Sequence, residues 1–306
     1  MKLQTPVEIT PLARPIGLRN RLAFIGSCFA EHIGAKMRES GLPALVNPFG
    51  VLFNPLSIVQ ALTQNLMNDA FYFEDEDHCW HSWLAGSKFN ASSLEACRAG
   101  ILAARGKLVE WAPDTLVITL GTNHYYERND SHLAVGNCHK RPQNEFTEQT
   151  LSLEQCIEAL DTICQLFSRS QIIMTVSPYR YAKYGFHESR LSKATLLLAI
   201  EEVIQRRPQQ VSYFPAYEIQ LDELRDYRFY APDMLHPSEQ AIDYIWERFV
   251  DRWLDSEAHR YLVDFEPIRK ALQHRPDVPD SPASRRFREQ TQQQLRDLMA
   301  KYNLEL

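Results

Sequence analysis

The stretch Leu22-Ala23-Phe24-Ile25-Gly26-Ser27-Cys28-Phe29-Ala30 decides the fold, because it predicts a buried strand that passes directly into a helix. Its first four residues are apolar without polar alternation, as in a strand covered on both faces of a parallel sheet. A helical pattern over residues 28–40 follows. The hydroxyl of Ser27 should therefore stand at the carboxyl edge of the sheet, where α/β proteins bind their ligands.

Four further apolar runs extend this pattern, at residues 44–47, 115–120, 171–176 and 211–214. Helical patterns occupy residues 55–66, 92–109, 150–168 and 190–206, and another follows the last strand at 237–254. This alternation predicts an α/β fold, a three-layer α/β/α sandwich with a central, mostly parallel five-stranded sheet of the flavodoxin-like, doubly wound type. In such a fold Gly50, Asn123 and Ser177 would join Ser27 at the carboxyl ends of the strands.

A second motif near the other end of the chain, Asp233-Met234-Leu235-His236-Pro237, places an acid three residues before a histidine. That spacing lets the carboxylate fold back onto Nδ1 of the imidazole while Nε2 faces outward. A histidine held in this way can take the proton of a serine hydroxyl, which is otherwise a weak nucleophile. Taken singly, Ser27, Asp233 and His236 would more often be helix caps, because each precedes a helical pattern. Taken together, they predict the nucleophile, orienting acid and base of an acyl-transfer site.

Composition and charge narrow the class of protein. The chain has 306 residues, 44% of them hydrophobic, which is enough for a sizeable core. Its 33 basic and 39 acidic residues give a net charge of −6, which argues against a nucleic acid or an anionic membrane as the main partner. Residues 1–20 contain three prolines and no apolar leader, and no stretch approaches the ~20 apolar residues of a membrane span. We therefore expect a cytoplasmic protein that does not span a membrane.

The cysteines and histidines raise the question of a metal. The six cysteines have neither Cys-x-x-Cys spacing nor the density of a secreted scaffold, so we expect reduced thiols at Cys28, Cys79, Cys97, Cys138, Cys156 and Cys164. The neighbours His78-Cys79-Trp80-His81 and Cys138-His139 offer ligand types without the repeated spacing of a structural zinc site. The sequence also contains no glycine-rich phosphate loop. We expect no metal and no cofactor.

The C-terminal residues differ from the rest of the chain. We expect a main domain over residues 1–265 and an appendage over 266–306, in which Pro276–Pro282 form a linker and residues 285–302 a helix. The apolar positions of this helix are Phe287, Leu295, Leu298, Met299 and Tyr302. A helix this short needs a partner for its apolar stripe. It should dock either on its own domain or on a second copy of the chain, so a homo-oligomer is one possible outcome.

The motifs carry a family resemblance. Residues Gly26–Ala30 spell the signature of the GSCFA-domain family, which resembles the SGNH/GDSL hydrolases. Other segments between residues 20 and 255 are similar to the same family, among them Asn47-Pro48-Phe49-Gly50, Thr119-Leu120-Gly121-Thr122, Asn137-Cys138-His139-Lys140, Ser192-Lys193-Ala194 and Asp226-Tyr227-Arg228-Phe229-Tyr230.

The resemblance implies an SGNH hydrolase type of fold and roles for particular residues. Ser27 would be the nucleophile, His236 the base and Asp233 the group that orients it. The oxyanion hole would combine the N–H of Ser27, the N–H of Gly50 and the side-chain amide of Asn123. The block Gly121-Thr122-Asn123-His124 departs from the hydrolase pattern, because a histidine stands where that pattern has an aspartate.

These observations predict a serine esterase of SGNH type that removes an acyl group, such as acetyl, from a carbohydrate through an acyl-enzyme. An O-acyltransferase with the same triad and a non-catalytic carbohydrate-binding or scaffold module are the alternatives. Cys28 is the alternative nucleophile, although as the first helical residue it should point inward. Loop residues expected to line the cleft and hold the substrate include Trp83, His139, Lys140, Arg180 and Lys193, with Trp80 and His81 as further candidates.

Overall fold

The computed structural model describes residues 4–276, 278 and 281–304. Its central sheet consists of β1 (Leu22–Gly26), β2 (Ala44–Val46), β5 (Thr115–Leu120), β9 (Gln171–Val176) and β10 (Val211–Tyr213). The strand order is β10-β9-β5-β1-β2, and every neighbouring pair is parallel. The predicted five-stranded α/β fold is therefore confirmed.

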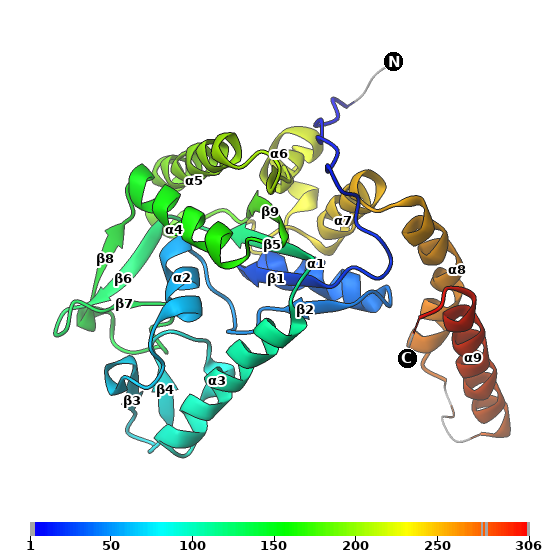
Figure 1. Ribbon diagram of the computed structural model, residues 1–306, viewed down its shortest axis with the longest axis horizontal. Coiled ribbons are helices and arrows are strands. Elements are labelled where there is room, and N and C mark those ends of the chain that lie inside the picture. The colour runs from blue at the N-terminus through cyan, green and yellow to red at the C-terminus, as the bar shows by residue number, and fades with distance from the viewer. Residues whose placement is uncertain (1–3, 277, 279–280, 305–306) are drawn as a thin grey trace.

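Helices cover both faces of this sheet (Figure 1). One face packs against α2 (Pro55–Thr63), α3 (Leu94–Trp111), α4 (Leu153–Leu166) and α5 (Phe186–Arg206), and the other against α1 (Cys28–Glu39) and α7 (Glu239–Trp253). Successive residues of a strand point to opposite faces. The paired row Phe24, Val117 and Ile173 accordingly enters the second core, and the next row, Ile25, Ile118 and Met174, enters the first. Burial on both faces explains why these strands are continuously apolar.

Two smaller sheets lie outside the sandwich, and the sequence analysis did not predict them. One is the hairpin of β3 (Tyr72–Glu74) and β4 (Trp80–Ser82), and the other consists of β6 (His124–Arg128), β7 (Ala134–Val135) and β8 (Phe146–Thr150). The remaining short elements are α6 (Ala216–Glu218), the π-helix Ile219–Leu224 and single turns of 3₁₀ helix at Asp69–Phe71, Ser87–Phe89, Gln143–Glu145, Ala182–Tyr184 and Tyr227–Phe229.

The chain ends in two helices, α8 (Ser256–Gln273) and α9 (Pro282–Lys301), which lie side by side at the periphery of the molecule (Figure 1). Leu298 and Tyr302 are buried there, and the Tyr302 ring stands edge-on to Tyr261 with 5.4 Å between ring centroids. The tail thus docks on its own chain. The expected division at 265/266 falls inside α8, and the predicted linker includes residues 277, 279 and 280, which lie outside the described residues.

Candidate active site

Ser27 follows β1 at the carboxyl edge of the sheet, as predicted. Its backbone N–H donates to the carbonyl of Thr119 (3.0 Å), so the chain leaves the sheet in a fixed direction. Gly26 has φ +141°, and a Cβ there would stand 2.1 Å from the Thr119 carbonyl oxygen, so glycine is required before the serine. The Ser27 hydroxyl does not cap α1. Its Oγ is buried and forms no hydrogen bond with any residue that the structure describes, so capping does not explain this serine.

Asp233 and His236 form the predicted pair. His236 Nδ1 and Asp233 Oδ2 are 2.5 Å apart, and Asp233 Oδ1 accepts from the backbone N–H groups of Leu235 (2.9 Å) and His236 (3.0 Å). Met234 supplies the left-handed turn between them, with φ +59°. Neither residue caps α7, because Ser238 does so through Ala241. The pair leaves Nε2 of the half-exposed His236 ring available.

Neighbouring hydrogen-bond donors stabilise the negative charge of Asp233. The hydrogen bond from the His236 side chain, followed by those from the N–H groups of His236 and Leu235, lowers the pKa of Asp233 to about 2. The carboxylate is therefore ionised throughout the neutral and mildly acidic range. Such a carboxylate fixes the imidazole with its proton on Nδ1 and stabilises the imidazolium form.

Tyr179, in the loop after β9, lies between the two motifs. Its ring packs on His236 with 4.3 Å between centroids. Burial raises the pKa of the Tyr179 hydroxyl, and the nearby Asp233 and Cys28 raise it further. The following residue, Arg180, donates from its N–H to the carbonyl of Leu235 (3.1 Å) and from its guanidinium to that of Met234 (3.1 Å). This loop therefore joins the histidine to the sheet edge that carries Ser27.

The three predicted oxyanion donors all have other partners. The N–H of Ser27 donates to Thr119, that of Gly50 donates to the carbonyl of Asn47 (2.9 Å), and Asn123 Nδ2 donates to the carbonyl of Leu151 (2.8 Å). The backbone N–H groups of Ser27 and Gly50 are therefore engaged within the chain, whereas the side-chain amide of Asn123 has a second N–H beyond the one bonded to Leu151. The backbone requires glycine at position 50, because φ is +81° there and an added Cβ would stand 3.0 Å from the Cα of Gly86.

The side chain of Asn47, which sequence reasoning did not single out, also lies next to Gly26. Asn47 follows β2 and is 2% exposed, and its Oδ1 accepts from the N–H of Gly26 (2.9 Å), the residue before the serine. This bond fixes which end of the amide faces Gly26. The Nδ2 of Asn47 is buried without a partner in the described part of the chain. Asn47 occurs in a segment that the sequence analysis noted, but only the folded chain reveals its unused N–H₂.

The expected substrate-binding residues fall into two groups. Arg180 flanks His236 and lines a hollow of about 110 Å³ together with Tyr179 and Arg190. Lys140 is exposed, and His139 is half-buried, with its Nε2 2.7 Å from the carbonyl of Ser82. These three remain candidates for contact with a substrate.

Trp83 and Lys193 belong to the interior, which corrects the expectation that they line the cleft. Trp83 is 1% exposed and stacks on Phe73 at 3.9 Å between centroids. Lys193 is 2% exposed, and both of its hydrogen bonds go to backbone carbonyls. A substrate in the cleft would not touch either side chain in this conformation.

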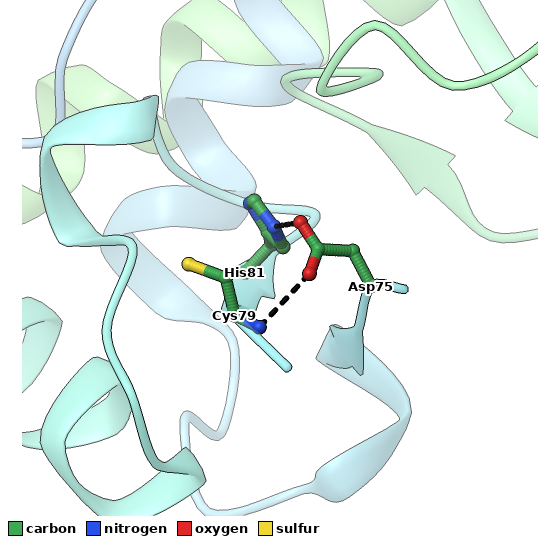
Figure 2. Close-up of side chains that lie close together, drawn as sticks. All are labelled: Asp75, Cys79 and His81. Atoms are coloured by element: carbon green, nitrogen blue, oxygen red, sulfur yellow. Dashed lines mark hydrogen bonds and ion pairs between the residues drawn. The ribbon is translucent and has the colours of Figure 1, made fainter. Parts of the chain in front are cut away.

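The side chains of Asp75, Cys79 and His81 gather at the β3–β4 hairpin, as Figure 2 shows. Asp75 Oδ2 lies 2.7 Å from His81 Nε2, and Oδ1 accepts from the N–H groups of Asp77 (3.0 Å) and Cys79 (2.8 Å). These hydrogen bonds hold Asp75 against His81 and the backbone of Cys79. All six cysteines are free thiols.

The fold and these contacts define an α/β protein with a serine after the first strand and an aspartate–histidine pair held by the loop after β9. The chain belongs to the GSCFA family. The model of the GSCFA family matches residues 21–249, and that of the GSCFA domain protein, C-terminal domain, matches residues 265–306. The resemblance drawn from the motifs is thereby confirmed. A search of the curated proteins gives no match.

Two solved structures are distantly similar. One is a family 3 carbohydrate esterase from Clostridium thermocellum, with 12% identity and a TM-score of 0.35 over 83% of this chain and 99% of that one. The other is a family two carbohydrate esterase from the same organism, in complex with cellohexaose, with 13% identity and a TM-score of 0.39 over 78% of this chain and 65% of that one.

Proposed function

We propose that this protein is a serine esterase of SGNH type that hydrolyses an ester-linked acyl group, such as acetyl, on a carbohydrate. The observation that carries the proposal is the hydrogen-bonded pair of Asp233 and His236, joined through the Tyr179 loop to the sheet edge that bears Ser27. Membership of the GSCFA family supports it, because the family model matches residues 21–249, which include both segments. Helix capping, the main alternative role of these residues, is performed by Ser238 at α7 and is absent at Ser27.

The reaction would proceed in two displacements. His236 Nε2 takes the proton of Ser27 as Oγ attacks the ester carbonyl carbon, and the oxyanion collapses as the alcohol leaves with that proton. Water then attacks the acyl-enzyme, again with His236 as base, and releases the acid and the free serine. Ser27 and His236 share no hydrogen bond among the described residues, so substrate binding has to bring Oγ and Nε2 within reach. Such contacts commonly close only in the substrate complex.

The pKa of the neighbouring thiol also favours Ser27 over Cys28 as the nucleophile. The attacking form of a cysteine is the thiolate. Burial raises the pKa of the Cys28 thiol above its ordinary value of 9.0. Cys28 is therefore poorly suited to attack at neutral pH, whereas a serine needs only a base at the moment of attack.

We assign an oxyanion-stabilising role to Asn47. We expect Asn47→Asp to lower kcat by about 10²–10³-fold with little change in KM, because a donor aimed at the oxyanion matters in the transition state. The substitution keeps an oxygen that can accept from the N–H of Gly26, removes the N–H₂ group and puts a second carboxyl oxygen in its place. Steady-state kinetics on an activated acetyl ester measures the effect.

Asn54→Asp is the matched control. Asn54 is also buried and caps α2 through an oxygen that aspartate retains, so its activity should stay within a few fold of the wild type. Wild-type kcat in Asn47→Asp would remove Asn47 from the oxyanion hole. A loss in Asn123→Ala alone would then return that role to Asn123.

A substrate screen tests the proposed function as a whole. The purified protein should release p-nitrophenol from p-nitrophenyl acetate and acetate from acetylated sugars. Parallel reactions with free sugar acceptors distinguish hydrolysis from acyl transfer. None of the helices in the described part of the chain has the length and apolar character of a membrane span.

A further inference from the structure

The first half of α5 turns a polar face toward the interior. Ser189, Ser192 and Lys193 are spaced so that they share one side of the helix, and each is at most 6% exposed. A helix normally buries an apolar stripe. Here the N–H of Tyr181 donates to Ser189 Oγ (3.3 Å), and that of Asn123 donates to Ser192 Oγ (3.0 Å). This face therefore binds the loops that leave two neighbouring strands.

Lys193 occupies the centre of this face. Its Nζ donates to the carbonyl of Gly121 (2.6 Å) and to that of Ser177 (2.7 Å). Because Leu120 and Val176 are paired at the ends of β5 and β9, these two carbonyls belong to the first residues beyond the paired strands. The ammonium group of Lys193 thus links the residues that directly follow β5 and β9.

No carboxylate accompanies this charge. Within the described residues Lys193 forms no salt bridge, and its other close neighbours are the rings of Tyr181 and Tyr217, with Nζ 5.1 and 5.8 Å from their centroids. Burying an ammonium ion without a counter-charge is costly, and apolar side chains often replace buried charges without loss of stability. A lysine here needs a reason other than packing.

The loops that it holds lead to the candidate catalytic groups. Ser177 begins the loop that packs Tyr179 on His236 and bonds Arg180 to the carbonyls of Met234 and Leu235. A shift of Ser177 would therefore move the histidine relative to the sheet edge that carries Ser27. Misplacement of a catalytic group by about 1 Å can cost about 10²-fold in rate.

We propose that Lys193 is a positioning residue of this site. Its ammonium group ties Gly121 to Ser177 and thereby keeps the loop after β9, which contacts His236, in a fixed position relative to Ser27. The inference rests on the proposed esterase function. It concerns the contacts of the ammonium group and not any contact with substrate.

If the ammonium group of Lys193 positions the site, activity should depend on its protonation and therefore on pH. Burial lowers the pKa of Lys193 to about 7, although the nearby Cys28 opposes this. The other groups that face it are Cys28 of α1, Tyr181 of the β9 loop and Tyr217 of α6, and burial raises the pKa of each. Among these groups only Lys193 changes charge near neutrality. The ammonium form is present below about pH 7 and is lost above it, so activity should fall on the alkaline side.

The test compares Lys193→Met and Lys193→Arg with the control Lys107→Met, which makes the same change at an exposed lysine of α3. With p-nitrophenyl acetate, we expect Lys193→Met to lower kcat by about 10–100-fold at pH 6.5, to leave KM within about twofold, and to lose the alkaline limb near pH 7. Arginine stays charged at all working pH values, so Lys193→Arg should recover much of kcat and extend activity to higher pH.

Hydrogen exchange separates this inference from the proposed function. Lys193→Met should accelerate amide exchange in residues 121–124 and 177–181 by about tenfold or more, while Lys107→Met should not. This measurement applies even if the wild type hydrolyses no ester, in which case the esterase proposal fails alone. Unchanged kcat, pH profile and exchange in Lys193→Met would overturn the positioning role. Loss of the fold in both Lys193 variants would also overturn it, because Lys193 would then be required for stability.

Discussion

Ser27→Ala is expected to lower the turnover of p-nitrophenyl acetate by about 10³-fold or more while the protein stays folded. The substitution removes only the hydroxyl oxygen, which forms no hydrogen bond with the described residues, so little stability depends on it. The N–H of Ser27, which holds the sheet edge through Thr119, is retained. Steady-state kinetics and circular dichroism on the same preparation measure both expectations.

Cys28→Ala is the control for this prediction. It changes the adjacent residue, whose thiol is kept protonated by burial, and should retain turnover within a few fold. A wild-type rate in Ser27→Ala would contradict the role of Ser27 as nucleophile. An inactive Cys28→Ala beside an active Ser27→Ala would also contradict it, because the cysteine would then be the nucleophile.

Asp233→Asn should reduce kcat by as much as ~10⁴-fold, the loss seen in serine proteases when the orienting acid is made neutral. The asparagine oxygen can still accept from the N–H groups of Leu235 and His236, so the turn should persist. The amide removes the charge that stabilises the imidazolium, and its N–H₂ group favours the wrong tautomer of His236. Kinetics together with a thermal melt distinguishes lost chemistry from lost fold.

Asp226→Asn provides a matched comparison. Asp226 is another exposed aspartate that accepts a backbone N–H two residues on, from Arg228 (2.9 Å), but it has no hydrogen bond or ion pair with a histidine of the described residues. Its replacement should leave kcat within about twofold, as for most surface substitutions. Equal and small effects at both positions would assign Asp233 to the turn alone.

The sheet could be predicted from sequence because burial on both faces leaves a strong signal. The runs around Phe24, Val117 and Ile173 are uninterrupted, and the observed strands match the predicted ones to within one residue at each end. The β3–β4 hairpin and the β6–β7–β8 sheet were missed because their strands are short and partly polar, as in His124–Arg128, where every residue is half-buried. Tertiary contacts, not local pattern, decide such strands.

The candidate site was only partly predictable for a related reason. The motifs placed Ser27 and the Asp233–His236 pair, because strand ends and an acid three residues before a histidine can be read locally. The hydrogen bond that engages Asn123 and the burial of Lys193 depend on how α5 and the chain before α4 pack on the sheet edge. Sequence spacing carries no information on such packing. For the same reason Asn47 emerges as a donor only in the folded chain.

Mass spectrometry after labelling with a fluorophosphonate tests directly whether Ser27 is the nucleophile, since the probe reacts with a serine that a neighbouring base activates. Both candidate nucleophiles lie in one tryptic peptide, residues 22–36, and fragmentation of that peptide separates them. We expect one phosphonyl group on Ser27 in the wild type and none in His236→Ala. Labelling at Cys28, or labelling of Ser27 that is as fast in His236→Ala as in the wild type, would contradict it.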